Sequence, residues 1–207
     1  AEAAPVTIDL ELKAGLQLAA MIGYPSDPMR ADCAFGHLTS GGTLANVQGL
    51  RLALALKCFP VALCVAKVPL DELPGDDWNA FNLAHADAIA LLDRWREFLK
   101  TLSPHERSRW RAQVERARVE SLGLHDFFEQ HPALAPPLVF APATAHYSWS
   151  KGLKLIGLGR NALKLVPESG MRTDMGALDA MLDAALAERL SALRAPALGR
   201  GFVACAS

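Results

Sequence analysis

The feature that most constrains the fold is the alternation of short apolar strands with helices in the last third of the sequence. The segments are, in chain order, a strand at 137–142, a helix at 151–159, a strand at 162–167, a helix at 174–193 and a strand at 202–206. Strands that alternate with helices favour a parallel sheet, because each helix carries the chain back to the same edge. We therefore predict the α/β class, with a mostly parallel sheet flanked by helices.

The sequence before residue 76 predicts two helices joined by a turn-rich segment. The first spans 5–23, where Ile8, Leu12, Leu16 and Ala19 recur at helical spacing and Gly23 ends the pattern. The second helix is expected at about 44–58. Residues 60–75 are punctuated by proline and only partly apolar, so we expect the helix to have ended before them.

Residues 76–131 form a block with a different composition. A helical stripe runs through Ile89, Leu92, Trp95 and Leu99, and Ser103-Pro104 begins a new helix. Residues 94–118 contain eight Lys or Arg but only three Glu, and three of the four tryptophans lie in the block. Basic residues interleaved with tryptophan can bind phosphate-rich ligands, but a helical hairpin with a solvated basic face has the same pattern.

Composition excludes several classes of protein. Hydrophobic residues make up 51% of the 207 residues and charged residues 21%, which excludes a disordered chain. The net charge of −1 gives no attraction to nucleic acid or to an anionic membrane, and charges and proline interrupt the most apolar stretch. The four cysteines lack the spacing of a zinc site, so we predict no metal. Cys58 and Cys64 lie in apolar runs and are expected to be buried thiols in a cytoplasmic protein.

Two stretches of the chain have the residue types of a functional site. Thr39-Ser-Gly-Gly-Thr43 opens directly into a helix, where glycine backbone, free N–H groups and hydroxyls suit a phosphate. The same pattern is also ordinary punctuation at the start of a helix. His146 follows a strand and precedes a helix, and ligands of α/β sheets bind at the carboxyl ends of strands. A histidine in such a loop can equally be structural.

Taken together, the two stretches resemble the group II pyridoxal-phosphate-dependent decarboxylases, the family of glutamate and aromatic-amino-acid decarboxylases. The resemblance rests on GxxTSGGTxAN at 36–46 and HxSxxK at 146–151. Weaker similarities cover the Asp-Leu-Glu helix at 9–11, Met-Arg-Thr-Asp at 171–174 and the strand at 202–207. The matching segments span about 1–58 and 137–207, in the order of the family.

The resemblance implies a cofactor and a role for each matching residue. Pyridoxal 5′-phosphate would have its phosphate held by Ser40, Gly41, Gly42 and Thr43. His146 would stack on the pyridine ring, and would orient the carboxylate of the amino-acid substrate or take part in proton transfer. Lys151 stands where the family has an ordinary helix residue, so it is expected to be a solvated lysine without a catalytic role.

The resemblance also implies what the complete enzyme needs. The chain would be the N-terminal part of the large domain of a fold-type-I enzyme, divided into 1–75, a helical insertion at 76–131, and an incomplete β/α part at 132–207. The Schiff-base lysine of the family would lie on a complementary C-terminal part or a second chain. The complete enzyme would be a homodimer with active sites at the subunit interface. The insertion would cover an active site, mediate assembly or bind a partner.

The expected activity is decarboxylation of an L-amino acid, with an aromatic substrate favoured and an acidic one second. Another pyridoxal-phosphate lyase, or an aldehyde-forming enzyme on the same scaffold, would use the same loop and histidine. A catalytically silent, helical interaction protein is the alternative from a different class.

Overall fold

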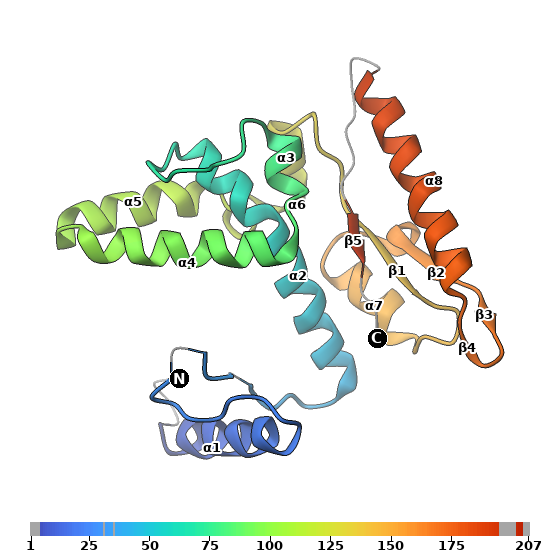
Figure 1. The fold of residues 1–207 in the computed structure, drawn as a ribbon, viewed down its shortest axis with the longest axis horizontal. Helices are drawn as coiled ribbons and strands as arrows, with labels where there is room; N and C mark the ends of the chain where they lie inside the picture. The colour runs from blue at the N-terminus through green and yellow to red at the C-terminus, as the bar shows by residue number, and fades with distance from the viewer. Residues whose placement is uncertain (1–4, 31, 35, 195–201, 205–207) are drawn as a thin grey trace. The chain divides into compact units, whose positions relative to one another are not determined.

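The computed structural model describes residues 5–30, 32–34, 36–194 and 202–204 (Figure 1). The chain divides into two compact units, which separate after Ala45. The part of the final predicted strand beyond Ala204 lies outside the described residues.

The first unit consists of helix α1 (Pro5–Met21) and the irregular segment that follows it. The predicted helix is confirmed, and Gly23 adopts a φ of 86° directly after its end. The segment returns along the helix: a Cβ atom on Gly15 would lie 2.7 Å from the carbonyl oxygen of Gly36. The backbone N–H of Leu38 also donates to the Glu11 carboxylate at 2.9 Å. The glycine at position 15 therefore permits the close approach.

Helix α2 (Gly42–Val65) is longer than the sequence predicts, because it continues through Pro60. The five residues from Phe59 to Leu63 are all buried, with at most 8% of any residue exposed. Their packing in the core offsets the loss of one helical hydrogen bond at Pro60. By length and apolar composition α2 could also cross a membrane, and half of its apolar window is buried inside the fold. A buried core helix satisfies the same criterion.

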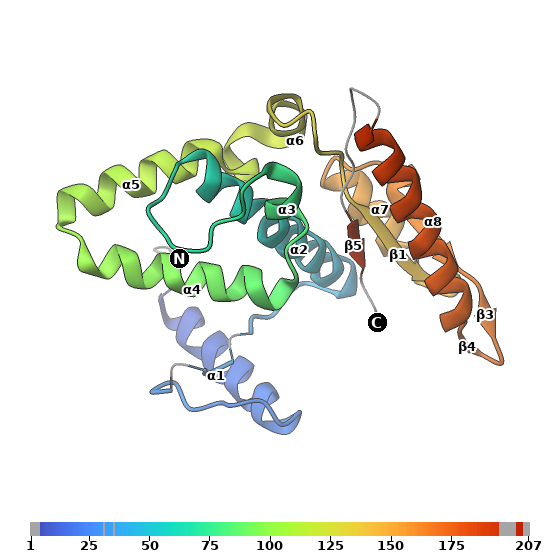
Figure 2. The same cartoon turned by 45° about the horizontal axis from the view of Figure 1, so that its top comes forward.

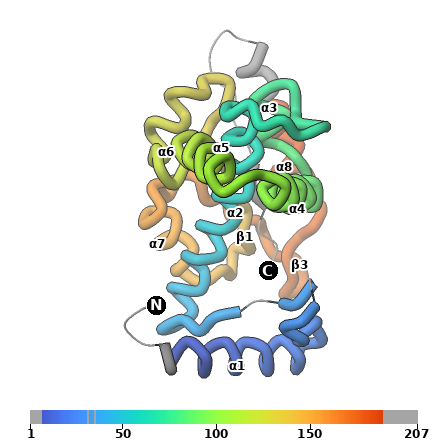
Figure 3. Tube along the Cα trace, turned by 90° about the vertical axis from the view of Figure 1, so that its left-hand side faces the viewer, coloured from blue at the N-terminus to red at the C-terminus, as the bar shows by residue number. Residues whose placement is uncertain are grey.

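Four helices follow α2, and they occupy the block predicted to be helical. They are α3 (Asp77–Phe81), α4 (His85–Thr101), α5 (Pro104–Ala117) and α6 (Val119–Gln130). Figures 2 and 3 show α4 and α5 side by side as a hairpin. The predicted stripe on α4 is displaced: Ile89 is 47% exposed, whereas Ala88, Leu91, Trp95 and Leu99 are buried. The packing partner, rather than the hydrophobicity of a single residue, decides which face is covered.

The tryptophans of this block pack against the core, Trp95 as a buried residue and Trp78 and Trp110 as partly buried ones. Trp95 and Trp110 pack in the cluster formed by α2, α4 and α5, and Trp78 packs in a second cluster around Phe81 and Phe127. Basic side chains on the outside of α4 pair with acids one turn away, as Arg96 does with Asp93. These contacts favour the interpretation of a solvated basic face.

The predicted parallel sheet is present in the second half of the chain. Strands β1 (Leu138–Pro142), β2 (Leu163–Val166) and β5 (Phe202–Ala204) are ordered β2-β1-β5, and both pairings are parallel. In the register, Val139 lies opposite Leu163 on one side and Val203 on the other.

Helices cover both faces of this sheet (Figures 1 and 2). Val139 packs with Leu153 of α7 (Ser148–Leu155), whereas its neighbour Phe140 packs with α8 (Met175–Arg194). Adjacent strand residues point to opposite faces, so the two residues contact two different helices. The arrangement is the layered α/β architecture predicted from the sequence.

Two details of this part differ from the prediction. Helix α7 begins at Ser148, three residues earlier than expected, and the short 3-10 turn η1 (Arg160–Ala162) precedes β2. A hairpin of β3 (Glu168–Ser169) and β4 (Arg172–Thr173) also lies before α8. Gly170 and Met171 form its turn with φ of 57° and 62°, the left-handed pair of a tight hairpin. The hairpin was not predicted from the sequence because each of its strands has only two residues.

Candidate functional site

The glycine loop at the start of α2 has the properties of an anion site. The carbonyl of Gly41 accepts hydrogen bonds from the N–H groups of Leu44 and Ala45 and from the hydroxyl of Thr39. Among the described residues, the N–H groups of Gly42 and Thr43 have no acceptor, as is usual in the first turn of a helix.

The space around the loop is open. A Cβ atom placed on Gly41 or on Gly42 would meet nothing within 4 Å. Gly41 has a φ of 147°, a conformation that side-chain-bearing residues rarely adopt. Ser40 is exposed and Thr43 is half-buried at the first turn of the 24-residue helix. Free N–H groups, open space and two hydroxyls therefore fit the phosphate of a cofactor.

His146 lies in the turn between the carboxyl end of β1 and the start of α7, as the sequence predicts. The turn is held by a hydrogen bond from the N–H of Ala145 to the carbonyl of Pro142 at 2.8 Å. The imidazole is exposed, and its ring centroid lies 4.0 Å from that of Tyr147. The histidine is therefore accessible at the end of the sheet where α/β proteins bind ligands.

Two residues that sequence analysis did not assign hold the imidazole in place. Ser148 donates its backbone N–H to Nδ1 of His146 at 3.2 Å, and its Oγ lies 2.9 Å from the same nitrogen. The Asn46 side chain, on α2, donates its Nδ2 to Oγ of Ser148 at 2.8 Å. Asn46 is the last residue of the first motif and Ser148 lies within the second, but the motifs do not show that the two side chains meet.

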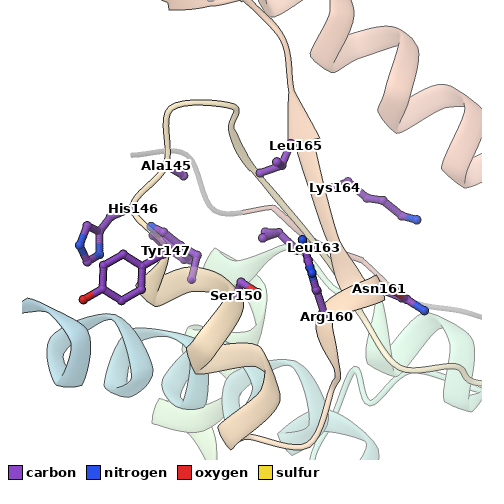
Figure 4. A pocket seen from close by; sticks show the side chains of 10 residues that line it. Ala145, His146, Tyr147, Ser150, Arg160, Asn161, Leu163, Lys164 and Leu165 are labelled. Carbon is purple, nitrogen blue, oxygen red and sulfur yellow. The ribbon is translucent and has the colours of Figure 1, made fainter.

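His146 borders an open pocket of about 450 Å³ (Figure 4). Tyr147 and Ser150 of the α7 turn line it, together with Arg160 and Lys164 from η1 and β2. No acidic side chain is among the described lining residues, so the pocket carries positive charge. Such a pocket suits a ligand with a carboxylate or another anionic group.

Lys151 lies next to this pocket without lining it. Its Nζ is 4.4 Å from the centroid of the Tyr147 ring, a cation–π distance, and the residue is exposed. These contacts agree with the prediction of a solvated helix residue. The five predicted site residues are described in two units: the loop residues 40–43 in the first and His146 in the second.

The fold and these residues define the class as an α/β chain with an open glycine loop at the start of a helix and a histidine at the end of a strand. No model of a known protein family matches the chain. Three curated proteins are similar to it, and each is named L-tyrosine decarboxylase.

The relative from Levilactobacillus brevis is 27% identical over 190 residues, which cover 91% of this chain and 26% of that protein. The relative from Enterococcus faecalis (strain ATCC 700802 / V583) is 26% identical over 193 residues, 93% of this chain and 27% of that protein. The relative from Enterococcus faecium is 24% identical over 182 residues, 86% of this chain and 25% of that protein. The chain thus spans about a quarter of the length of the relatives it matches. Their names support the resemblance to amino-acid decarboxylases.

Proposed function

We propose that this chain is part of a pyridoxal-phosphate-dependent decarboxylase of aromatic L-amino acids, with tyrosine the first substrate to test. The observation that carries the proposal is the Asn46–Ser148 hydrogen bond. It ties the turn that bears His146 to Asn46, the last residue of the GxxTSGGTxAN motif. The three relatives named L-tyrosine decarboxylase support the same substrate class.

In this proposal each element of the site has a separate task. The N–H groups of Gly42 and Thr43, with the hydroxyls of Ser40 and Thr43, bind the 5′-phosphate. The imidazole of His146 would pack against the pyridine ring with the face that does not contact Tyr147. The same imidazole would orient the substrate carboxylate. When bound, pyridoxal phosphate supplies the electron sink for the charge left when CO₂ departs.

The rest of the enzyme is proposed from the resemblance alone. The lysine that binds the cofactor covalently would come from a C-terminal part or a second chain, and the complete enzyme would be a homodimer. An acidic amino acid is the second candidate substrate. The division of the chain at 75/76 and 131/132 and the cytoplasmic location also stay predictions.

Binding of the cofactor phosphate can be tested on the chain itself. Pyridoxal 5′-phosphate is titrated against it while tryptophan fluorescence is followed, with pyridoxal, which lacks the phosphate, as the control ligand. Thr43→Ala should weaken binding of the phosphorylated ligand about tenfold, the effect of one hydrogen bond to a charged group. Thr101→Ala, a matched change at an exposed threonine of α4, should leave it unchanged. Equal affinity for the two ligands would contradict the proposed phosphate site.

The reaction is tested with the complementary C-terminal part present. Addition of pyridoxal phosphate should give an absorbance band at about 420 nm, as expected for imine chemistry. Tyrosine should then yield CO₂ and the corresponding amine, whereas ammonia or an aldehyde would indicate another pyridoxal-phosphate enzyme. A missing band, together with unchanged binding in His146→Ala and Thr43→Ala, would support the catalytically silent alternative.

A further inference from the structure

The hydrogen bonds around His146 have directions that the atom types decide. A backbone N–H can only donate, so Nδ1 of His146 accepts the bond from Ser148 with its ring lone pair. The neutral ring must then carry its proton on Nε2. Because Nδ1 is the acceptor, the hydroxyl of Ser148 donates to it across the 2.9 Å contact.

The second link has the matching direction. Once the Ser148 hydroxyl donates to the ring, its oxygen is left to accept, and Nδ2 of Asn46 is a donor only. The two side-chain bonds therefore point the same way, from the Asn46 amide through the Ser148 hydroxyl to Nδ1 of His146, and the backbone N–H of Ser148 donates to the same nitrogen. Ser148 is fully buried, so leaving its hydroxyl without a hydrogen-bond partner would be costly.

We propose that Asn46 and Ser148 are positioning residues that hold His146 as the Nε2–H tautomer. The imidazole then presents a hydrogen-bond donor to the ligand and no basic lone pair on Nε2. A donor matches a carboxylate, and the positive charges of Arg160 and Lys164 line the same pocket. The assignment of the substrate carboxylate as the acceptor rests on the proposed function, whereas the tautomer itself does not.

The tautomer is measured directly by long-range ¹H–¹⁵N correlation spectra of the chain labelled with [¹⁵N]histidine. The chain contains six histidines, and the signals of His146 are identified by their loss in His146→Gln. Spectra are recorded at about pH 8.5, where a free imidazole is neutral. The proposal requires the Nε2–H pattern for His146, and an Nδ1–H pattern in the unsubstituted chain would overturn it without any further variant.

Asn46→Asp tests the relay with almost no change in side-chain size. A carboxylate at position 46 can only accept, so the Ser148 hydroxyl should turn towards it and offer its lone pair to the ring instead. The Nδ1–H population of His146 should then rise about fivefold or more, the effect of losing one net hydrogen bond. Asn161→Asp is the matched control, because Asn161 lines the same pocket, is exposed and lies outside the relay.

A second pair of variants keeps the test decisive if Asn46→Asp does not fold. Ser148→Ala should raise the Nδ1–H population in the same direction, and Ser148→Thr, which keeps the hydroxyl, should restore the Nε2–H form. Equal spectra for Asn46→Asp and Asn161→Asp, or for Ser148→Ala and Ser148→Thr, would overturn the relay. These measurements use no cofactor, so a failure to bind pyridoxal phosphate would refute the proposed function and leave the positioning role standing.

Discussion

At the contact between α7 and α2, Gly152→Ala should change the free energy of unfolding in opposite directions depending on whether residue 50 is leucine or alanine. Gly152 lies in the middle of α7, and a Cβ atom there would lie 2.9 Å from Cδ1 of Leu50 and 3.4 Å from Cγ2 of Val47. Ordinary carbon contacts are about 3.5–4.0 Å, so Leu50 would have to move by roughly 0.6–1 Å. Leu50 is only 3% exposed, which limits that movement.

Two opposing effects set the magnitude for Gly152→Ala. Alanine in place of glycine in a helix interior stabilises by about 0.8–1 kcal/mol, whereas overpacking a core costs about 1–3 kcal/mol. We therefore expect a net loss of about 1 kcal/mol in the free energy of unfolding. Leu50→Ala alone should cost about 2–5 kcal/mol, because it leaves a cavity. With that cavity present the clash disappears, so Gly152→Ala should now stabilise by about 1 kcal/mol.

The assay is urea unfolding of the four proteins, followed by far-ultraviolet circular dichroism and by tryptophan fluorescence. The two single substitutions and the double variant define a coupling energy, which should be about 2 kcal/mol. If Gly152→Ala stabilises equally in both backgrounds, α7 does not pack on α2 as described. The same clash should loosen the 2.8 Å Asn46–Ser148 bond, so Gly152→Ala should also raise the Nδ1–H population of His146.

Three further predictions concern other parts of the chain. Burial raises the pKa of the Cys58 thiol, so iodoacetamide at about pH 8 should modify half-buried Cys33 before Cys58, which should react only on unfolding. Peptide mass spectrometry would show the order, and equal labelling rates of the two thiols would contradict the burial of Cys58. Ser103→Ala removes the cap of α5 and should lower the free energy of unfolding by about 1 kcal/mol in urea titrations at pH 7. The hydrogen bond from Ser103 lowers the pKa of Glu106, so this difference should persist above the ordinary glutamate range and shrink as the pH falls through the lowered pKa. Gly15→Ala should expose the 36–38 segment to faster amide exchange, because its Cβ would meet the Gly36 carbonyl, and unchanged exchange would disprove that contact.

The layered fold was predictable because its signals are local. Alternating strands and helices require the parallel order, and the glycine-ended and capped helices fix most element boundaries to within a few residues. The α5 cap illustrates this, since Ser103 and Glu106 satisfy each other three residues apart. Such contacts depend only on neighbouring residues, which a sequence displays directly.

The errors arose where packing against a distant segment overrides a local preference. Proline at position 60 predicts a helix end, yet α2 continues through it. Burial of the apolar stretch 59–63 stabilises the helix by more free energy than the missing hydrogen bond costs. The stripe on α4 was displaced because Ala88 faces the core while the more hydrophobic Ile89 faces outwards. In both cases the deciding contact lies on another helix, which no window of sequence contains.

The candidate site contains both residues that are predictable from their type and residues whose role depends on contacts made only in the folded chain. The glycine loop and His146 were predictable from residue type, because an anion needs free N–H groups and a ligand of an α/β sheet binds after a strand. Asn46 and Ser148 belong to the same motifs, but the sequence does not show that they meet, because 102 residues separate them. Each could equally be an ordinary helix residue without a role in the site. Their chemistry comes from the direction of the three hydrogen bonds, in which a backbone N–H leaves Nδ1 only the role of acceptor. The proton on Nε2 is thus a consequence of the folded geometry, and it turns a residue that could act as acid or base into a hydrogen-bond donor.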